Sequence, residues 1–289
     1  MVSMKDSVAI IKHTDDIATT LEKGSALLDG LTGFQSPLII KPNLCAGIDR
    51  TGYTNTKVDL VEAFIHLVLK KKSDLSICIV ESDSEAKYAD EAFDKFGYTA
   101  LAQRFRRLGS DVALINLSKS STVPVELDGL YFKNPELPRE LVEAKYFVSM
   151  AVAKTHGLTF ITGAMKNLFG VLPRKDKSFY HPSITEVVVD LNRCVRPSLC
   201  IVDARMGLEG WDGPRKRPIH VLLMGTFPLS VDATLARIMG FQPDKIRHLV
   251  EAEKYGLGSL TPRTVGEPPD SVMVKFAVPF HLSPKALAK

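Results

Sequence analysis

The chain has 289 residues, of which 45% are hydrophobic and 24% are charged, a composition typical of packed globular proteins. Its formal net charge is only +4, and basic residues are interspersed with acids, so no nucleic-acid partner is expected. No apolar run reaches the roughly 18 residues needed to cross a bilayer, so no membrane partner is expected either. The N-terminal segment has no signal-peptide pattern and the four cysteines are scattered, which favours a cytoplasmic protein.

Apolar runs of strand length alternate with amphipathic helical patterns, which predicts an α/β fold with an open, mostly parallel or mixed sheet flanked by helices. Strands are expected at residues 7–13, 37–41, 75–82, 111–117, 145–156, 198–207, 220–226 and 271–278. Helices are expected at residues 14–31, 56–72, 90–109 with a break near Gly97, 183–195, 229–240 and 243–258.

The segment around residues 118–140 differs from this pattern. It holds three prolines and short alternating pieces, which predicts a small β-rich insertion in the form of a hairpin. We expect residues 1–289 to form a single domain, with a division into two lobes near residues 118–145 as the alternative.

Polar side chains gather at the carboxyl ends of several predicted strands. These residues are Lys41, Asn43, Glu81, Lys154, His156, Asp203 and Glu209. Because ligands of open α/β sheets bind beyond the carboxyl ends of the strands, we expect the polar residues to converge on one cleft. The segment that follows His156 adds Thr162, Lys166 and Asn167 to this set, within an otherwise apolar sequence.

These residue types indicate an anion-binding cleft. Three lysines, Lys41, Lys154 and Lys166, would attract a carboxylate or phosphate, and burial would make a lysine lose its proton more easily. The amides of Asn43 and Asn167 would orient the ligand, with Thr162 and Glu81 beside them.

Histidine is the residue type best suited to proton transfer near neutral pH. His156 is the candidate proton-transfer group, and Asp203 would orient its ring. Alternatively, Asp203, Glu209 and His181 would contribute to a metal site. Each residue alone also has a structural interpretation, such as a solvated lysine, a helix cap at Glu81, or a turn at His181 before Pro182.

Known catalytic signatures do not narrow the reaction. No GxGxxG, GxxxxGKS, GxSxG or HExxH pattern is present. Cys194 and Cys200 have no further cysteines at metal-binding spacing, so a zinc or iron–sulfur site there is not expected. The residues therefore indicate a binding cleft more firmly than any particular reaction.

The motifs "IIKPN", "VES", "AKTH", "ITGAMKNLFG", "IVDARMGLEGWDGP" and "SVDATLARIMG" occur in an order that resembles the domain of unknown function 362 family. The resemblance covers about residues 35–260. It places at the family's shared cleft Lys41, Asn43, Lys154, His156, Lys166, Asn167, Asp203 and Glu209. Members of that family often carry ferredoxin-like cysteine clusters and are described as iron–sulfur proteins. This chain has no CxxCxxC run, so its own [4Fe–4S] cluster is not expected, and electrons would have to come from a separate protein.

Three functions remain open from the sequence. The first is an enzyme that acts on a small anionic metabolite as an isomerase, lyase or oxidoreductase, with Lys154, Lys166, His156 and Asp203 as catalytic residues. The second is a redox or metal-dependent enzyme that holds a flavin or a divalent metal. The third is a non-catalytic binding protein, or an accessory to an electron-transfer partner. Substrate and oligomeric state are not encoded in any pattern that we recognise.

Overall fold

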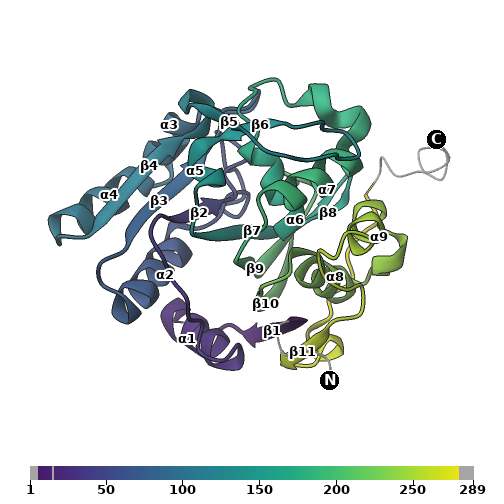
Figure 1. The fold of residues 1–289 in the computed structure, drawn as a ribbon. Coiled ribbons are helices and arrows are strands. Elements are labelled where there is room, and N and C mark those ends of the chain that lie inside the picture. The colour runs from purple at the N-terminus through teal and green to yellow at the C-terminus, as the bar shows by residue number, and fades with distance from the viewer. Residues whose placement is uncertain (1–5, 15, 280–289) are drawn as a thin grey trace.

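The computed structural model describes residues 6–14 and 16–279, and a twisted β-sheet runs through the middle of the molecule (Figure 1). Within these residues the sheet has nine strands, in the order β11-β1-β10-β9-β7-β2-β3-β4, with β8 beside β7. The strands are β1 (Ser7–Lys12), β2 (Leu38–Pro42), β3 (Ser76–Glu81), β4 (Asp111–Asn116), β7 (Tyr146–His156), β8 (Phe160–Thr162), β9 (Leu199–Glu209), β10 (Arg215–Gly225) and β11 (Arg263–Gly266).

Five neighbouring strands, β9, β7, β2, β3 and β4, run parallel. β10 lies antiparallel between β9 and β1, and β8 pairs antiparallel with the end of β7. The sheet is therefore mixed and mostly parallel, and the predicted fold class is confirmed. Because the five strands point the same way, their carboxyl ends meet at one edge.

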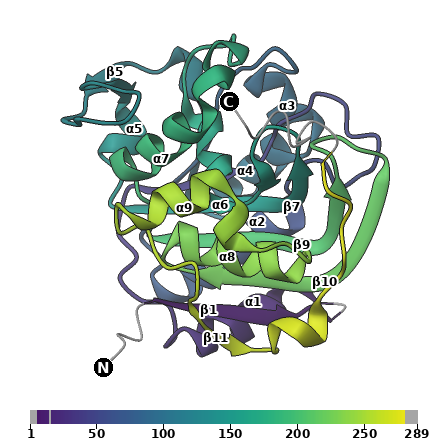
Figure 2. The same cartoon turned by 90° about the vertical axis from the view of Figure 1, so that its right-hand side faces the viewer.

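Helices cover both faces of the sheet. They are α1 (Ile17–Leu27), α2 (Val58–Lys71), α3 (Ala89–Lys95), α4 (Tyr98–Arg107), α5 (Arg139–Val142), α6 (Ala164–Asn167), α7 (Ile184–Cys194), α8 (Pro228–Ile238) and α9 (Arg247–Glu253). Side chains of α1, α2 and α4 form one core with the sheet, and those of α6 to α9 form a second core on the other face. Figure 2 shows α8 and α9 in front of the strands.

The two cores follow the alternation of side chains along each strand. In β2, Leu38 and Ile40 belong to the core under α2, whereas Ile39 belongs to the core under α6. In β9, Ile201 faces the first core and Val202 the second. A polar residue near a strand end therefore joins one face or the other according to its register.

The break predicted near Gly97 lies between α3 and α4. Gly97 has a φ of +85°, a left-handed conformation that glycine adopts without strain, and the helix restarts at Tyr98. The chain outside the helices and strands includes two short 3₁₀ segments that flank the site described below, η3 (Leu168–Val171) and η4 (Ser178–Ser183).

The predicted β-rich insertion is also present. β5 (Thr122–Pro124) and β6 (Glu136–Pro138) pair antiparallel as a separate two-stranded sheet. The buried carboxylate of Asp190 in α7 accepts hydrogen bonds from the backbone amides of Leu130, Tyr131 and Phe132 at 3.0, 2.8 and 3.0 Å. These bonds hold the tip of the insertion against α7.

The strand predicted at residues 271–278 is wrong. Residues 269–272 form a 3₁₀ turn, and residues 273–279 belong to no strand. The amides of Val274 and Phe276 donate to the carbonyls of Ile238 and Met239 at the end of α8, so this apolar segment packs on a helix end. The last strand of the sheet is β11, which pairs parallel with β1.

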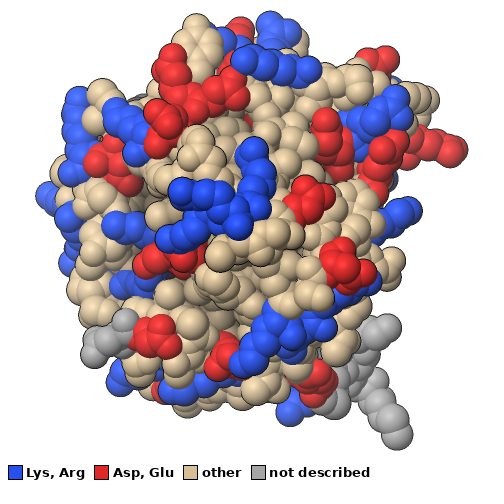
Figure 3. All heavy atoms as spheres, turned by 90° about the vertical axis from the view of Figure 1, so that its left-hand side faces the viewer, with Lys and Arg blue, Asp and Glu red and all other residues tan. Residues whose placement is uncertain are grey.

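Charged side chains of both signs are spread over the face of the molecule shown in Figure 3, as the low net charge suggests. No helix in the described part of the chain is long and apolar enough to span a membrane.

Candidate functional site

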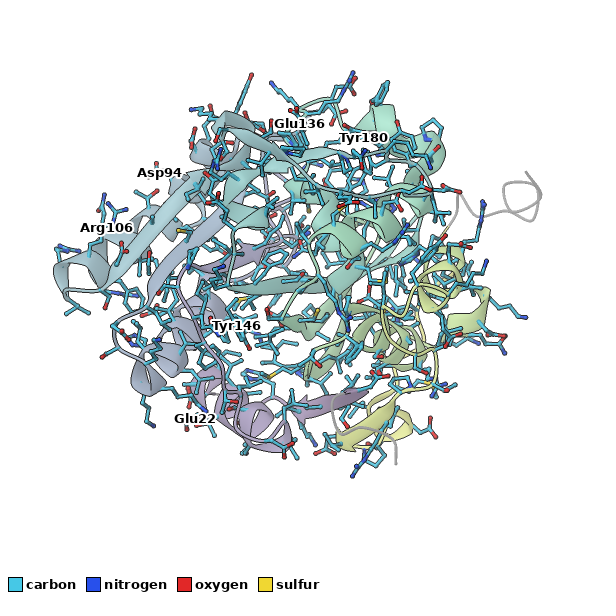
Figure 4. All side chains as sticks on the ribbon, viewed as in Figure 1. Glu22, Asp94, Arg106, Glu136, Tyr146 and Tyr180 are labelled. Atoms are coloured by element: carbon cyan, nitrogen blue, oxygen red, sulfur yellow. The ribbon has the colours of Figure 1, made fainter. Side chains whose placement is uncertain are left out.

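A pocket of about 540 Å³ opens beyond the carboxyl ends of β2, β3 and β7. Its lining includes Lys41, Asn43, Leu44, Cys45, Glu81, Lys87, Lys154, His156, Leu158, Thr162, Lys166, Asn167, Phe169, Lys177, His181 and Trp211. In Figure 4, Tyr180 of the flanking segment η4 lies near the top, far from Tyr146 at the amino end of β7. Nine of the eleven sequence-predicted site residues thus line one pocket, and Asp203 and Glu209 do not.

Lys41 and Glu81 form a buried ion pair across β2 and β3. The Lys41 Nζ lies 2.8 Å from Glu81 Oε2 and also donates to the Pro42 carbonyl at 2.9 Å. Burial alone would raise the pKa of Glu81, but the Lys41 and Lys87 ammonium groups lower it below its usual value. Glu81 therefore stays ionised and neutralises much of the charge of two lysines.

Lys154 is held by three protein acceptors. Its Nζ donates to Asn43 Oδ1 at 2.9 Å, to the Thr54 carbonyl at 2.5 Å, and contacts Cys45 Sγ at 3.1 Å. Only 1% of the Lys154 residue surface is exposed. None of these partners is a carboxylate, so Lys154 is held in the pocket wall without an ion pair.

The two amides connect these groups. Asn43 Nδ2 donates to Asn167 Oδ1 at 3.3 Å, and Asn167 Nδ2 donates to the Lys41 carbonyl at 3.1 Å and to Ser149 Oγ at 3.0 Å. The bonds fix α6 against β2 and β7. Asn43 and Asn167 thus satisfy buried polar groups of the pocket as well as lining it.

Lys166 differs from the other lysines of the pocket. No acid in the described residues forms an ion pair with it, and its Nζ lies 4.2 Å from the ring centroid of Phe169. Burial lowers the pKa of Lys166 to about 8, and the cations of Lys154 and Lys41 act in the same direction. This lysine therefore changes charge close to neutral pH.

His156 ends β7 and lines the same pocket. Its Nδ1 accepts the backbone N–H of Leu158 at 3.1 Å, so the neutral ring carries its proton on Nε2. Burial, followed by the cations of Lys166 and Lys154, lowers the pKa of His156 well below its usual value. The ring is neutral at pH 7 and offers Nε2–H as a hydrogen-bond donor. Thr162 in β8 pairs with Lys154 beside it.

Asp203 does not line the pocket. Its carboxylate pairs with Arg205 at 2.7 Å, and Arg205 also binds Asp59 of α2 at 2.8 Å. Asp203 continues the alternation of Leu199 and Ile201, which face α2. Its carboxylate accepts hydrogen bonds from Arg205 and not from His156.

Glu209 and His181 are not brought together as metal ligands. Glu209 pairs with Arg217 at 2.8 Å and accepts the backbone amide of Ala277 at 3.0 Å. The His181 ring lines the pocket and stacks on Phe169 with centroids 6.0 Å apart. Among residues 6–14 and 16–279, no group of three or more His, Cys, Asp or Glu side chains is placed to hold a metal ion.

Sequence reasoning missed two lysines of the pocket. Lys87 lies 3.6 Å from Glu81 Oε1, and Lys177 donates to Ser82 Oγ at 2.9 Å and to the Leu172 carbonyl at 2.6 Å. Burial lowers the pKa of Lys177 to about 7. Both residues come from loops, which the strand-end rule does not cover. They bring the lining to five lysines against the two acids Glu81 and Glu85.

These features define an α/β protein with a lysine-lined pocket beyond the carboxyl ends of its parallel strands. The chain belongs to the family described as domain of unknown function DUF362, whose family model matches residues 38–237. This match confirms the resemblance carried by the sequence motifs.

The proteins similar to this chain include one from a cyanobacterium and one of solved structure. The thylakoid-associated protein sll1697 of Synechocystis sp. is 25% identical over 243 residues, which are 80% of this chain and 72% of that protein. The lactate racemase apoprotein of Thermoanaerobacterium thermosaccharolyticum superposes with a TM-score of 0.45 at 11% identity. That match covers 88% of this chain but only 58% of the racemase chain, and a similarity at this level says nothing about the activity of the present protein.

Proposed function

We propose that this protein is an enzyme that binds a small carboxylate metabolite in the lysine-lined pocket and transfers a proton at the carbon next to a carbonyl or carboxyl group. The observation that carries the proposal is Lys166, a pocket lysine with no acid partner among the described residues and with a pKa of about 8.

The charge balance of the pocket supports anion binding. Lys41 and Lys87 share Glu81, whereas Lys154, Lys166 and Lys177 form no ion pair within the part of the chain that the structure describes. Unpaired cations are costly in a site of low dielectric constant, and an incoming carboxylate would relieve that cost. The ligand would therefore complete the electrostatics of the pocket.

The proton-transfer step follows from the protonation states. With a pKa of about 8, roughly a tenth of Lys166 is the neutral amine at pH 7, which is the form that accepts a proton. The C–H bond of the substrate breaks, a bond from the proton to Lys166 Nζ forms, and the electron pair moves onto the carbonyl oxygen as an enolate. The His156 Nε2–H and the Lys154 cation would stabilise that negative charge. In this step His156 acts as a hydrogen-bond donor to the enolate oxygen, and Lys166 accepts the proton.

Hydrogen–deuterium exchange tests the proposal. The protein is incubated in D₂O with a panel of 2-hydroxy and 2-oxo acids, and proton NMR follows loss of the signal next to the carboxyl or carbonyl group. We expect exchange with one class of acid, and a loss of about a hundredfold or more in K166M, the size of a general-base contribution.

The matched control is K254M, which removes the exposed lysine that directly follows α9. It should exchange at the wild-type rate. Binding of the acids without exchange would contradict catalysis and favour a binding protein. Exchange that survives in K166M would show that Lys166 is not the base.

A further inference from the structure

The pocket has a gradient from charge at its base to apolar surface at its mouth. Lys41 and Lys154 are each 1% exposed, whereas Leu158 and Trp211 are 42% and 44% exposed. All four residues line the same cavity. A ligand that satisfies both ends would place its anionic group deep in the pocket and an apolar part near the opening.

Aromatic rings form much of the apolar part. Phe169 and His181 are stacked with an interplanar angle of 23° and centroids 6.0 Å apart. Trp211 is the single tryptophan of the chain and lies on the loop that joins β9 to β10. The neighbouring amide of Gly210 donates to Thr155 Oγ1 of β7 at 2.7 Å, which fixes the start of this loop beside the pocket.

The size of the pocket exceeds the needs of the smallest acids. A volume of about 540 Å³ corresponds to roughly 18 water molecules at about 30 Å³ each. A two- or three-carbon acid would occupy a small part of it and would leave Leu158 and Trp211 at the mouth in contact with water. A ligand with a ring-sized body would cover them.

We infer that the ligand of this pocket is a carboxylate that carries an aryl ring, joined to the carboxyl group through a carbon that bears hydrogen. Its carboxylate binds at the lysines, and its planar ring packs against Trp211 at the mouth. The inference rests on the proposed function, because it assumes that the lysines bind a carboxylate. Aromatic rings favour planar partners through offset or edge-to-face contacts, and they gain less from a puckered aliphatic ring of similar size.

Three acids test the inference as binding probes: benzoate, which has a ring and a carboxylate but no hydrogen on the carbon next to the carboxyl group, cyclohexanecarboxylate and acetate. The full chain is titrated with each acid by calorimetry, and the fluorescence of Trp211 is followed in parallel. We expect benzoate to bind at least about tenfold more tightly than acetate and several-fold more tightly than cyclohexanecarboxylate, and to change the Trp211 emission.

The variant W211A distinguishes binding at the mouth of the pocket from binding at the lysines. It should weaken benzoate binding by roughly three- to tenfold and leave acetate binding unchanged, since acetate does not reach the mouth. Trp211 is largely exposed, so its removal should not unfold the protein. W211F should restore most of the affinity for benzoate.

Different failures have different meanings. Equal affinities for benzoate and acetate would overturn the aryl carboxylate and leave the proposed carboxylate pocket standing. Equal affinities for benzoate and cyclohexanecarboxylate would overturn the planar requirement. If none of the three acids binds, the proposed function fails together with the inference.

Discussion

At the scale of single residues, two lysines of one pocket have opposite surroundings. Lys41 is bonded to Glu81, to the Pro42 carbonyl and to Asn167. Lys166 forms no ion pair with the residues that the structure describes, and its ammonium group lies over the ring of Phe169. Removing one partner of a buried ion pair leaves an uncompensated charge and is strongly destabilising, whereas an unpaired cation in the pocket has a cost that a bound anion would offset.

Substitution by methionine should distinguish these two lysines. K41M leaves the buried Glu81 without its main partner and should lower the free energy of unfolding by about 3 kcal/mol. K166M should change it by less than about 1 kcal/mol, because no ion pair is lost. Urea unfolding followed by circular dichroism measures both. A large loss of stability in K166M would indicate a structural lysine and weaken the assignment of Lys166 as a ligand-binding residue.

At the scale of elements, a side chain of α8 binds the amino end of the short helix α6. The backbone amides of Ala164 and Met165 donate to the two carboxylate oxygens of Asp232 at 2.6 and 3.0 Å. Gly163 permits this approach, because a Cβ there would lie 2.1 Å from Asp232 Oδ1. Asp232 thereby positions α6, the helix that carries Lys166.

The ionisation of Asp232 should make the unfolding free energy of the protein depend on pH. Burial raises its pKa to about 7, against 3.8 as the ordinary value, in spite of the two amide bonds. The folded state therefore binds the Asp232 proton more tightly than the unfolded state does. The unfolding free energy that this proton contributes is lost as the pH rises through 7. Relative to D232N, which does not titrate there, the wild type should lose about 2 kcal/mol of unfolding free energy between pH 5 and pH 8.

Urea unfolding of both proteins at several pH values measures that difference. D94N serves as the control, because Asp94 is an exposed residue of α3 (Figure 4) and its removal should give a difference that does not vary with pH. A difference between wild type and D232N that is flat from pH 5 to pH 8 would mean that Asp232 stays ionised throughout this range.

At the scale of the whole molecule, the sequence was sufficient to predict the site residues that the strand topology alone brings together. Parallel strands share one carboxyl edge, so Asn43 after β2, Glu81 at the end of β3 and Lys154 at the end of β7 had to come close together. Asp203 lies in a parallel strand too, but β9 continues beyond it to Glu209, so Asp203 is set back from the carboxyl edge and pairs with Arg205. The sequence pattern did not determine where this strand ends.

Two features of the structure depend on the path of segments outside the sheet, which the sequence pattern does not predict. Lys87 and Lys177 reach the pocket from loops, whose paths are not encoded in periodicity. Residues 271–278 carry a strand-like pattern, yet the amides of Val274 and Phe276 bond to carbonyls at the end of α8 and not to a strand. Local pattern predicts an extended segment there, and tertiary packing decides which partner it meets.

The most direct test of this account is an NMR titration of the Lys166 side chain, followed by its ¹³Cε shift in lysine-labelled protein and assigned by its loss in K166M. Lys177, which also titrates near neutral pH, is assigned in the same way with K177M. We predict a midpoint near pH 8 for Lys166, and an upward shift when benzoate is added, because a bound anion stabilises the ammonium form. A midpoint near 10.4, as for an exposed lysine, together with no response to carboxylates, would contradict the account.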